Sequence, residues 1–133
     1  MYKLNDLIGI PFENGARQLD KCDCMGLAVM AHKCYNIDIP DFKIDAFSDP
    51  DISGTFIEQL ESNNWVKLEK PEAPCIVCMA MTSEYPDLVT HIGTYIGNDR
   101  ILHTLKGKTS YTFKLDHPFF KNKILGFYKY GKD

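Results

Sequence analysis

The sequence lacks any apolar run long enough to cross a membrane as a helix, which takes about 20 consecutive apolar residues. It also lacks the apolar stretch of a secretory signal, because Lys3, Asn5 and Asp6 interrupt its beginning. We therefore expect no membrane span and synthesis in the cytoplasm without a signal peptide. If the protein acts at a cell wall, another component must carry it there.

An excess of basic residues is absent too. The chain has 15 Lys and Arg against 18 Asp and Glu, a formal net charge of −3 and a pI of about 5.8. This balance gives no support for a nucleic-acid partner. Lysines do gather after position 105, and we interpret them as a solvated face.

Internal repeats, linkers and low-complexity segments are missing as well. The 133 residues are 44% hydrophobic and 25% charged, which is typical of a globular domain with its own core. We assign residues 1–133 to one domain.

Cysteines are few and odd in number: Cys22, Cys24, Cys34, Cys75 and Cys78. An odd count without a secretion signal disfavours a disulfide framework. Structural zinc held by Cys22, Cys24, Cys75 and Cys78 is an alternative. The first pair is spaced more tightly than zinc ligands usually are, and the second pair lies in an apolar strand. We therefore expect neither a metal nor another cofactor.

Hydrophobic periodicity predicts helices first and strands second. Residues 2–9 are typical of a short helix ending near Gly9, residues 12–22 of an irregular segment, and Asp23 of an N-cap for a buried helix over 24–36. A loop over 38–50 and a helix over 53–62 follow. Six strands are then predicted, at Trp65–Leu68, Cys75–Met81, His91–Ile96, Arg100–Thr104, Tyr111–Leu115 and Lys123–Tyr130. This order predicts an α+β fold, with helices on one side of an antiparallel sheet.

Cys24 is the best candidate for a nucleophile. Its predicted place in the first helical turn offers unpaired N–H groups and the positive end of the helix dipole, and both favour a thiolate. The same N–H groups could stabilise the oxyanion of a tetrahedral intermediate. A cysteine in an apolar helix is more often a small buried side chain, so Cys24 alone decides nothing.

Histidines on later strands strengthen the case. His91 opens one predicted strand and His103 lies in the next, which fits a nucleophile, a base and a group that orients the base. His32, two turns beyond Cys24, and His117, beside Pro118, are more typical of surface residues.

These motifs resemble, in order and spacing, the NlpC-type family of papain-like cell-wall cysteine peptidases, and the phage- and prophage-encoded members most. The resemblance covers nearly the whole chain. It is carried by Gly9-Ile10-Pro11-Phe12-Glu13-Asn14-Gly15, Asp23-Cys24-Met25-Gly26-Leu27, His91-Ile92-Gly93-Thr94-Tyr95-Ile96-Gly97-Asn98, Ile101-Leu102-His103 and Gly126-Phe127-Tyr128-Lys129.

The resemblance implies N-terminal helices packed on a curved antiparallel sheet of about five to six strands. It also implies hydrolysis of amide bonds in peptidoglycan stem peptides, next to γ-linked D-glutamate, by a protein associated with a phage tail or virion. Cys24 would be the nucleophile, His91 the base and His103 the group that orients it, with no metal. Asp23, Met25 and Phe12 would contribute to substrate binding or the oxyanion environment.

Two residues depart from the family pattern. Phe12 stands where many members have a tyrosine, so its side chain cannot donate a hydrogen bond. Met25 stands where many bacterial members have serine, which makes that side of the pocket less polar. Both departures motivate an alternative: an inactive relative that binds peptidoglycan or a tail component. A related amidase or acyltransferase on the same fold is a further alternative.

The geometry of the two histidines is open at this stage. A tight turn at Asn98-Asp99-Arg100 would pair Tyr95 with His103 and put His103 on the face of His91. The two would then be offset by about four residues, or roughly 13 Å. A twist, a bulge or a wider turn would have to bring the imidazoles together.

Overall fold

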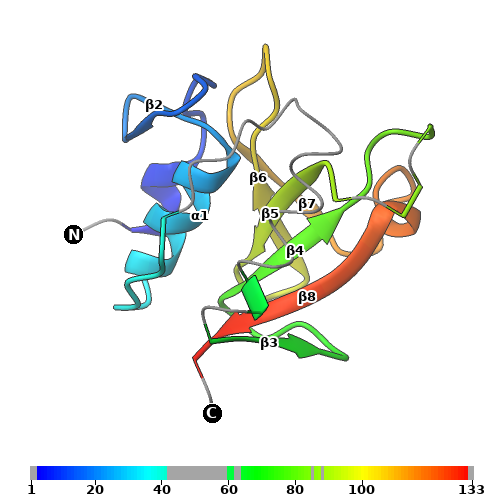
Figure 1. Cartoon of the computed structure of the whole chain (residues 1–133). Helices are drawn as coiled ribbons and strands as arrows, with labels where there is room; N and C mark the ends of the chain where they lie inside the picture. Colours follow the sequence, from blue (N-terminus) through cyan, green and yellow to red (C-terminus); the bar gives the residue numbers. More distant parts are fainter. Residues whose placement is uncertain (1–2, 42–59, 62–63, 85, 88, 132–133) are drawn as a thin grey trace.

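The protein has an N-terminal helical part and a C-terminal sheet, which lie side by side (Figure 1). The computed structural model describes residues 3–41, 60–61, 64–84, 86–87 and 89–131. Its elements are η1 (Leu4–Leu7), β1 (Arg17–Gln18), β2 (Lys21–Cys22), α1 (Cys24–Lys33), β3 (Trp65–Leu68), β4 (Cys75–Met79), β5 (His91–Tyr95), β6 (Arg100–His103), β7 (Tyr111–Lys114), η2 (Lys121–Lys123) and β8 (Ile124–Tyr130). No helix in these ranges is long and apolar enough to cross a membrane.

The main sheet has six antiparallel strands in the order β3-β8-β4-β5-β6-β7. The last strand, β8, is long and curved, and it lies between β3 and β4 (Figure 1). Its pairing with β4 shifts register between Cys78 and Met79, and such an irregularity lets a strand bend. The predicted α+β class, the six strands and the helix packed on the sheet are confirmed.

The helix α1 packs against the sheet on one side and the N-terminal segment on the other. Met25 and Ala28 join a core cluster with Ile92 of β5, while Leu27 and Met30 join a second cluster with Leu7 and Ile10. Apolar side chains are therefore needed around most of the helix. The helix ends at Lys33, earlier than predicted, and Asn36 takes a positive φ of 62° just beyond it.

Two N-terminal predictions are wrong. In place of the helix predicted over residues 2–9, the described residues form the 3-10 helix η1, and the Asp6 carboxylate accepts a hydrogen bond from the Lys3 backbone N–H at its start. Residues 12–22 contain a small hairpin, β1–β2, where an irregular segment was expected. The predicted loop over 38–50 and helix over 53–62 lie mostly outside the described residues.

His32 is also misassigned by the sequence, because it is fully buried. Its Nδ1 donates to the Ala28 carbonyl at 2.8 Å, and its ring meets Trp65 edge-on at 5.6 Å between centroids. The backbone acceptor and the aromatic neighbour make an interior position tolerable for a histidine. His117 is exposed, as predicted.

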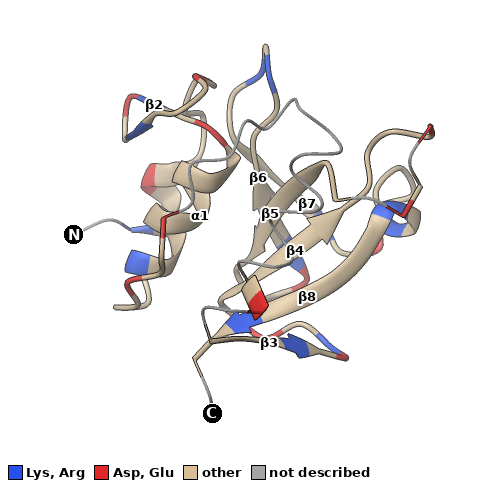
Figure 2. Cartoon of the chain, viewed as in Figure 1, with Lys and Arg blue, Asp and Glu red and all other residues tan. Residues whose placement is uncertain are grey.

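Charged residues lie on η1, α1, the N-terminal hairpin, the loops and several strands, and the ribbons of β4 and β5 carry none (Figure 2). All five residues of β4 are buried, as are the first four of β5. The centre of the sheet is therefore a dry, rigid support for anything placed at its ends.

Candidate active site

Cys24 is the first residue of α1, as predicted. Asp23 caps the helix, since its Oδ1 accepts a hydrogen bond from the Gly26 backbone N–H at 2.8 Å. The cap therefore uses the Gly26 N–H, while the Met25 N–H donates to the Cys24 sulfur. Cys24 itself is partly exposed, whereas Asp23 and Met25 on either side are buried.

Asp23 is held by more than its capping bond. The Gly15 backbone N–H donates to its Oδ2 at 2.7 Å, and Arg17 Nη1 lies 2.6 Å from its Oδ1. Arg17 is a functional candidate that the sequence reasoning missed. A buried carboxylate needs a cationic or N–H partner. The chain has two arginines, Arg17 and Arg100, so the sequence could have indicated Arg17 as a partner of the buried helix cap.

The pKa of the Cys24 thiol runs against expectation. Burial first, and then the negative charge of Asp23, raise this pKa to about 12, although backbone hydrogen bonds from Ile92 and Met25 and the charge of Arg17 act to lower it. The position at the helix start was expected to lower the pKa. Burial has the largest influence on this pKa and opposes the effect of the helix terminus.

The turn between β5 and β6 sets the positions of His91 and His103. Gly97, Asn98 and Asp99 all have positive φ, and Ile96 N–H donates to the Arg100 carbonyl at 3.0 Å. This three-residue turn pairs Tyr95 with Ile101, where a tight turn would have paired it with His103. Continuing that register sets His103 opposite Gly93, so the two histidines are offset by two residues on one face, and the predicted four-residue offset is wrong.

The two imidazoles make a direct hydrogen bond. His91 Nε2 lies 2.8 Å from His103 Nδ1, and both side chains are buried. Diagonal neighbours on paired strands come this close when nothing stands between them. Gly93, opposite His103 in this register, has no side chain to stand there, and a Cβ at this position would approach Ile101 Cγ2 to 2.7 Å.

His103 sits in a group of aromatic rings. Tyr111, Phe113 and Phe120 meet its imidazole edge-on, with centroids 4.6, 4.7 and 5.2 Å away. Its Nε2 is buried without a hydrogen-bond partner. Burial lowers the pKa of His103 to about 4, and burial together with the charge of His103 lowers that of His91 to about 3. Both rings are neutral near pH 7.

Cys24 and His91 approach through the backbone of β5. The Cys24 sulfur accepts hydrogen bonds from the backbone of Met25 and of Ile92, the residue after His91. None of the contacts among the described residues joins the sulfur to the His91 imidazole. A catalytic hydrogen bond is often long in a site without substrate.

Phe12 lies between the two halves of this region. It forms a bridge with Cys22, two residues before Cys24, and its N–H donates to the Lys108 carbonyl at 3.1 Å in the β6–β7 loop. Met25 places its side chain in the core against Ala28 and Ile92, with 2% exposed. The backbone of Met25, and not its side chain, therefore contacts the Cys24 sulfur.

A sequence model of the NlpC/P60 family matches residues 9–129. The chain belongs to the NlpC/P60 family. Proteins of this family are cysteine peptidases that generally hydrolyse cell-wall peptidoglycan. A search of curated protein sequences finds no match.

Solved structures share the NlpC/P60 fold with this chain. NlpC1 from Trichomonas vaginalis superposes with a TM-score of 0.66 at 20% identity, over 97% of this chain and 42% of that one. An NlpC/P60 family protein from Bacillus cereus gives 0.65 at 20% identity, over 95% and 37%. The NlpC/p60 domain of the peptidoglycan hydrolase SagA gives 0.56 at 13% identity, over 93% and 89%. The chain thus spans about two fifths of the first two proteins.

The NlpC/P60 chain does not gather its cysteines as a zinc site would require. Cys75 and Cys78 are buried in β4, and no three His, Cys, Asp or Glu side chains of the described residues are grouped as metal ligands. A separate groove of about 470 Å³ lies between β3 and β8, lined by Lys67, Leu68, Glu69, Ile124, Leu125, Gly126 and Phe127. It includes none of the predicted site residues. The candidate site is therefore assigned from residue types and contacts and not from the size of a groove.

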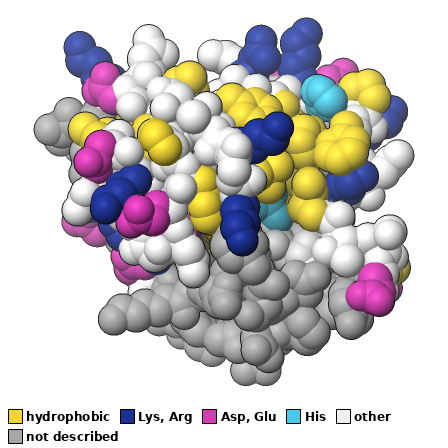
Figure 3. Space-filling model, turned by 90° about the horizontal axis from the view of Figure 1, so that it is seen from above, with side chains coloured by type: hydrophobic (Ala, Val, Ile, Leu, Met, Phe, Trp, Pro, Cys, Tyr) yellow, Lys and Arg dark blue, Asp and Glu magenta, His cyan; other side chains and the backbone are white. Residues whose placement is uncertain are grey.

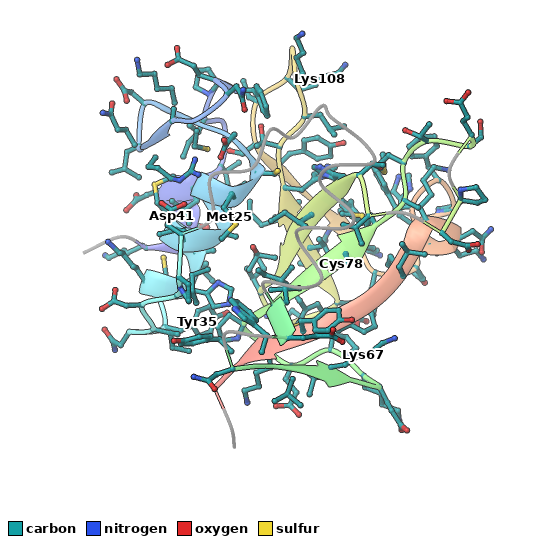
Figure 4. All side chains as sticks on the ribbon, in the orientation of Figure 1. Met25, Tyr35, Asp41, Lys67, Cys78 and Lys108 are labelled. Carbon is teal, nitrogen blue, oxygen red and sulfur yellow. The ribbon has the colours of Figure 1, made fainter. Side chains whose placement is uncertain are left out.

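The upper face of the molecule carries hydrophobic side chains in a band, with Lys and Arg side chains beside it (Figure 3). The start of α1 and the β6–β7 loop both reach this end of the molecule (Figure 1). Figure 4 shows Lys108 at the tip of that loop and Met25 at the start of the helix.

Proposed function

We propose that the protein is a cysteine peptidase that hydrolyses amide bonds in peptidoglycan stem peptides. Cys24 is the nucleophile, His91 the general base and acid, and His103 the group that orients His91. The observation that carries the proposal is the 2.8 Å hydrogen bond between His91 Nε2 and His103 Nδ1, beside a helix-start cysteine whose sulfur contacts the residue after His91.

The histidine pair supports this role through its tautomers. When His91 donates its Nε2 proton to His103 Nδ1, the lone pair on His91 Nδ1 is left to accept a proton from a thiol. His103 then carries its own proton on Nε2, which is buried without a hydrogen-bond partner.

Attack begins from neutral partners. The Cys24 thiol gives its proton to His91 Nδ1 while the sulfur adds to the amide carbon, and the carbonyl oxygen becomes an oxyanion. The backbone N–H of Cys24, at the start of α1, donates a hydrogen bond to that oxyanion. His91 then protonates the leaving amine as the C–N bond breaks, which leaves an acyl thioester on Cys24.

Water completes the cycle. His91 removes a proton from water, the hydroxide adds to the thioester carbon, and the sulfur leaves and is reprotonated. His103 keeps the imidazole of His91 oriented through both half-reactions.

The finer parts of the proposal concern substrate and location. Cleavage next to γ-linked D-glutamate and association with a phage tail or virion are predictions from the sequence resemblance.

Mass spectrometry of peptidoglycan stem-peptide digests tests the proposal. We expect the wild type to release new amine and carboxyl ends, and Cys24→Ala and His91→Ala to lose at least about 10³-fold in kcat/KM. His103→Ala should lose less, because a misoriented base still accepts protons.

Matched controls come from the same chain. Cys34→Ala removes a partly exposed cysteine at the other end of α1, and His117→Ala removes an exposed histidine. Both should keep wild-type activity. Full hydrolysis by Cys24→Ala would refute the mechanism, and binding of stem peptides without any cleavage by the wild type would favour the inactive relative.

A further inference from the structure

A buried carboxylate lies directly beside the candidate nucleophile. Asp23 is 1% exposed, and its two oxygens accept hydrogen bonds from Gly15, Gly26 and Arg17. A negative charge at this place opposes the formation of a second negative charge on Cys24. A cysteine peptidase with this arrangement needs something that offsets Asp23.

Arg17 meets that need. Its Nη1 lies 2.6 Å from Asp23 Oδ1 and also donates to the Ala16 carbonyl at 3.0 Å. Its Nε lies 3.0 and 2.9 Å from the two oxygens of Asp41. One guanidinium therefore joins a buried carboxylate to an exposed one, which the planar fork of arginine permits and the single ammonium of lysine does not.

We propose that Arg17 is a positioning residue of the catalytic site, whose charge offsets the buried Asp23 carboxylate so that the Cys24 sulfur can become negative during attack. Its guanidinium also holds the turn at residues 15–17 against the first turn of α1. This inference rests on the proposed role of Cys24 and adds a residue that does not itself touch substrate.

Packing at Gly26 supports the mechanical part of the inference. A side chain on Gly26 would meet the Ala16 carbonyl oxygen, and Arg17 Cδ at 3.0 Å. The turn that carries Arg17 thus lies directly on the helix start. Asp41 lies beside α1 in Figure 4, so the exposed end of the bridge is held as well.

Few other charges among the described residues can substitute for Arg17. His91 on β5 and His103 on β6 are kept neutral by burial, and Cys22 of β2 is a buried thiol whose pKa is raised to about 12, chiefly by burial. Lys21 of β2 is paired at the surface with Glu13 at 3.2 Å, and Asp6 of η1 adds negative charge. Arg17 lowers and Asp23 raises the pKa of the Cys24 thiol, while burial has the largest influence.

The experiment measures the alkylation rate of Cys24 by iodoacetamide across pH 6–10, with peptide mass spectrometry to assign the site. We expect Arg17→Gln to slow alkylation of Cys24 about tenfold across this pH range, which corresponds to a rise of its thiol pKa by about one unit. The double variant Arg17→Gln/Asp23→Asn removes both charges and should return to within about twofold of the wild type. Arg17→Lys keeps the charge and should lie between the wild type and Arg17→Gln.

Two controls separate charge from folding. Lys21→Gln removes one positive charge from the neighbouring strand and should leave the profile of Cys24 unchanged. If Arg17→Gln fails to fold by circular dichroism, the comparison of Arg17→Lys with the charge-free double variant still tests the offset. If Arg17 offsets the charge of Asp23, Cys24 of the double variant should be alkylated at least as fast as Cys24 of Arg17→Lys.

An unchanged profile in folded Arg17→Gln, or a double variant as slow as Arg17→Gln, would overturn the inference. Alkylation needs no peptidoglycan, so the result is independent of the hydrolysis assay. Hydrolysis by Cys24→Ala would instead sink the proposed function and leave the measured influence of Arg17 on the thiol intact.

Discussion

The nucleophile side and the base side of the candidate site use opposite surroundings. Around Cys24, charged and polar groups meet in a closed network of Asp23, Arg17 and the Gly15 and Gly26 N–H groups. Around His91 and His103, the neighbours are apolar or aromatic, and His103 Nε2 has no hydrogen-bond partner. Both sides nonetheless favour neutral reacting groups at rest.

The difference shows two ways to prepare a proton transfer. On the base side, removal from water lowers both histidine pKa values, and the charge of His103 lowers that of His91 further. On the nucleophile side, burial and Asp23 raise the thiol pKa, and Arg17 partly offsets Asp23. The histidine pKa values depend on the packing of the rings, and the thiol pKa depends also on the balance of nearby charges. Different substitutions should therefore disturb each side.

Lowering the pH should have the largest effect, because it destabilises the fold through its buried histidines. His91, His103 and His32 have pKa values lowered by burial to about 3, 4 and 4, below the ordinary 6.5. As pH falls below 6.5 the unfolded chain binds protons that the folded chain refuses, so the free energy of unfolding decreases until the folded pKa values are reached. Urea unfolding between pH 7 and 4 measures this, and a flat curve would contradict it.

Single-residue variants test whether buried histidines cause this pH dependence. His103→Gln should flatten the decrease below pH 6.5, because one lowered pKa is removed. His117→Gln, an exposed control, should leave the slope unchanged.

Gly26→Ala should be the most damaging substitution on the nucleophile side. The new Cβ would collide with the Ala16 carbonyl oxygen, a backbone atom that cannot swing away. Alanine favours a helix over glycine by about 1 kcal/mol, but the collision should outweigh this and reduce the free energy of unfolding by about 3 kcal/mol. Chemical denaturation measures the loss. Stability equal to or above wild type would show that the turn is free to move off α1.

Gly93→Ala should disturb the base side more mildly, by about 1–3 kcal/mol. Its Cβ would meet Ile101 Cγ2 at 2.7 Å and the Leu102 carbonyl at 3.3 Å. Gly126→Ala in β8 is the matched strand control, because its nearest atom, Lys67 Cε at 3.2 Å, belongs to a flexible side chain. Equal costs for the two variants would mean that Gly93 is not needed to bring the histidines together.

Breaking the exposed Lys21–Glu13 pair should have the smallest effect. Both side chains are well exposed, and pairs of this kind are worth about 0–1 kcal/mol. Lys21→Ala should change the free energy of unfolding by less than about 0.5 kcal/mol. A larger loss would mean that the β1–β2 hairpin depends on its surface charges as much as on Arg17.

Particular elements show what could be predicted. Strand positions were correct to within one or two residues, because turn-forming or polar residues bound the apolar runs. The predictions for the N-terminal turn and for residues 17–22 were wrong. The N-terminal turn is held in part by contacts distant in sequence. Gly9 N–H, for example, donates to the Ser110 carbonyl at 2.8 Å, and the Ser110 hydroxyl donates to the Leu7 carbonyl at 2.5 Å. Local propensity carries no signal for such bonds.

The sequence by itself determined the order of elements, the α+β class, the helix that starts at Cys24 and the histidine-bearing strands, because these depend on local patterns of apolar and capping residues. Only the tertiary structure decided that a three-residue turn brings His91 and His103 into hydrogen-bond contact, that burial keeps both neutral, and that Arg17 joins Asp23. Register, removal from water and ion pairing arise when distant segments meet, so no local pattern could have fixed them.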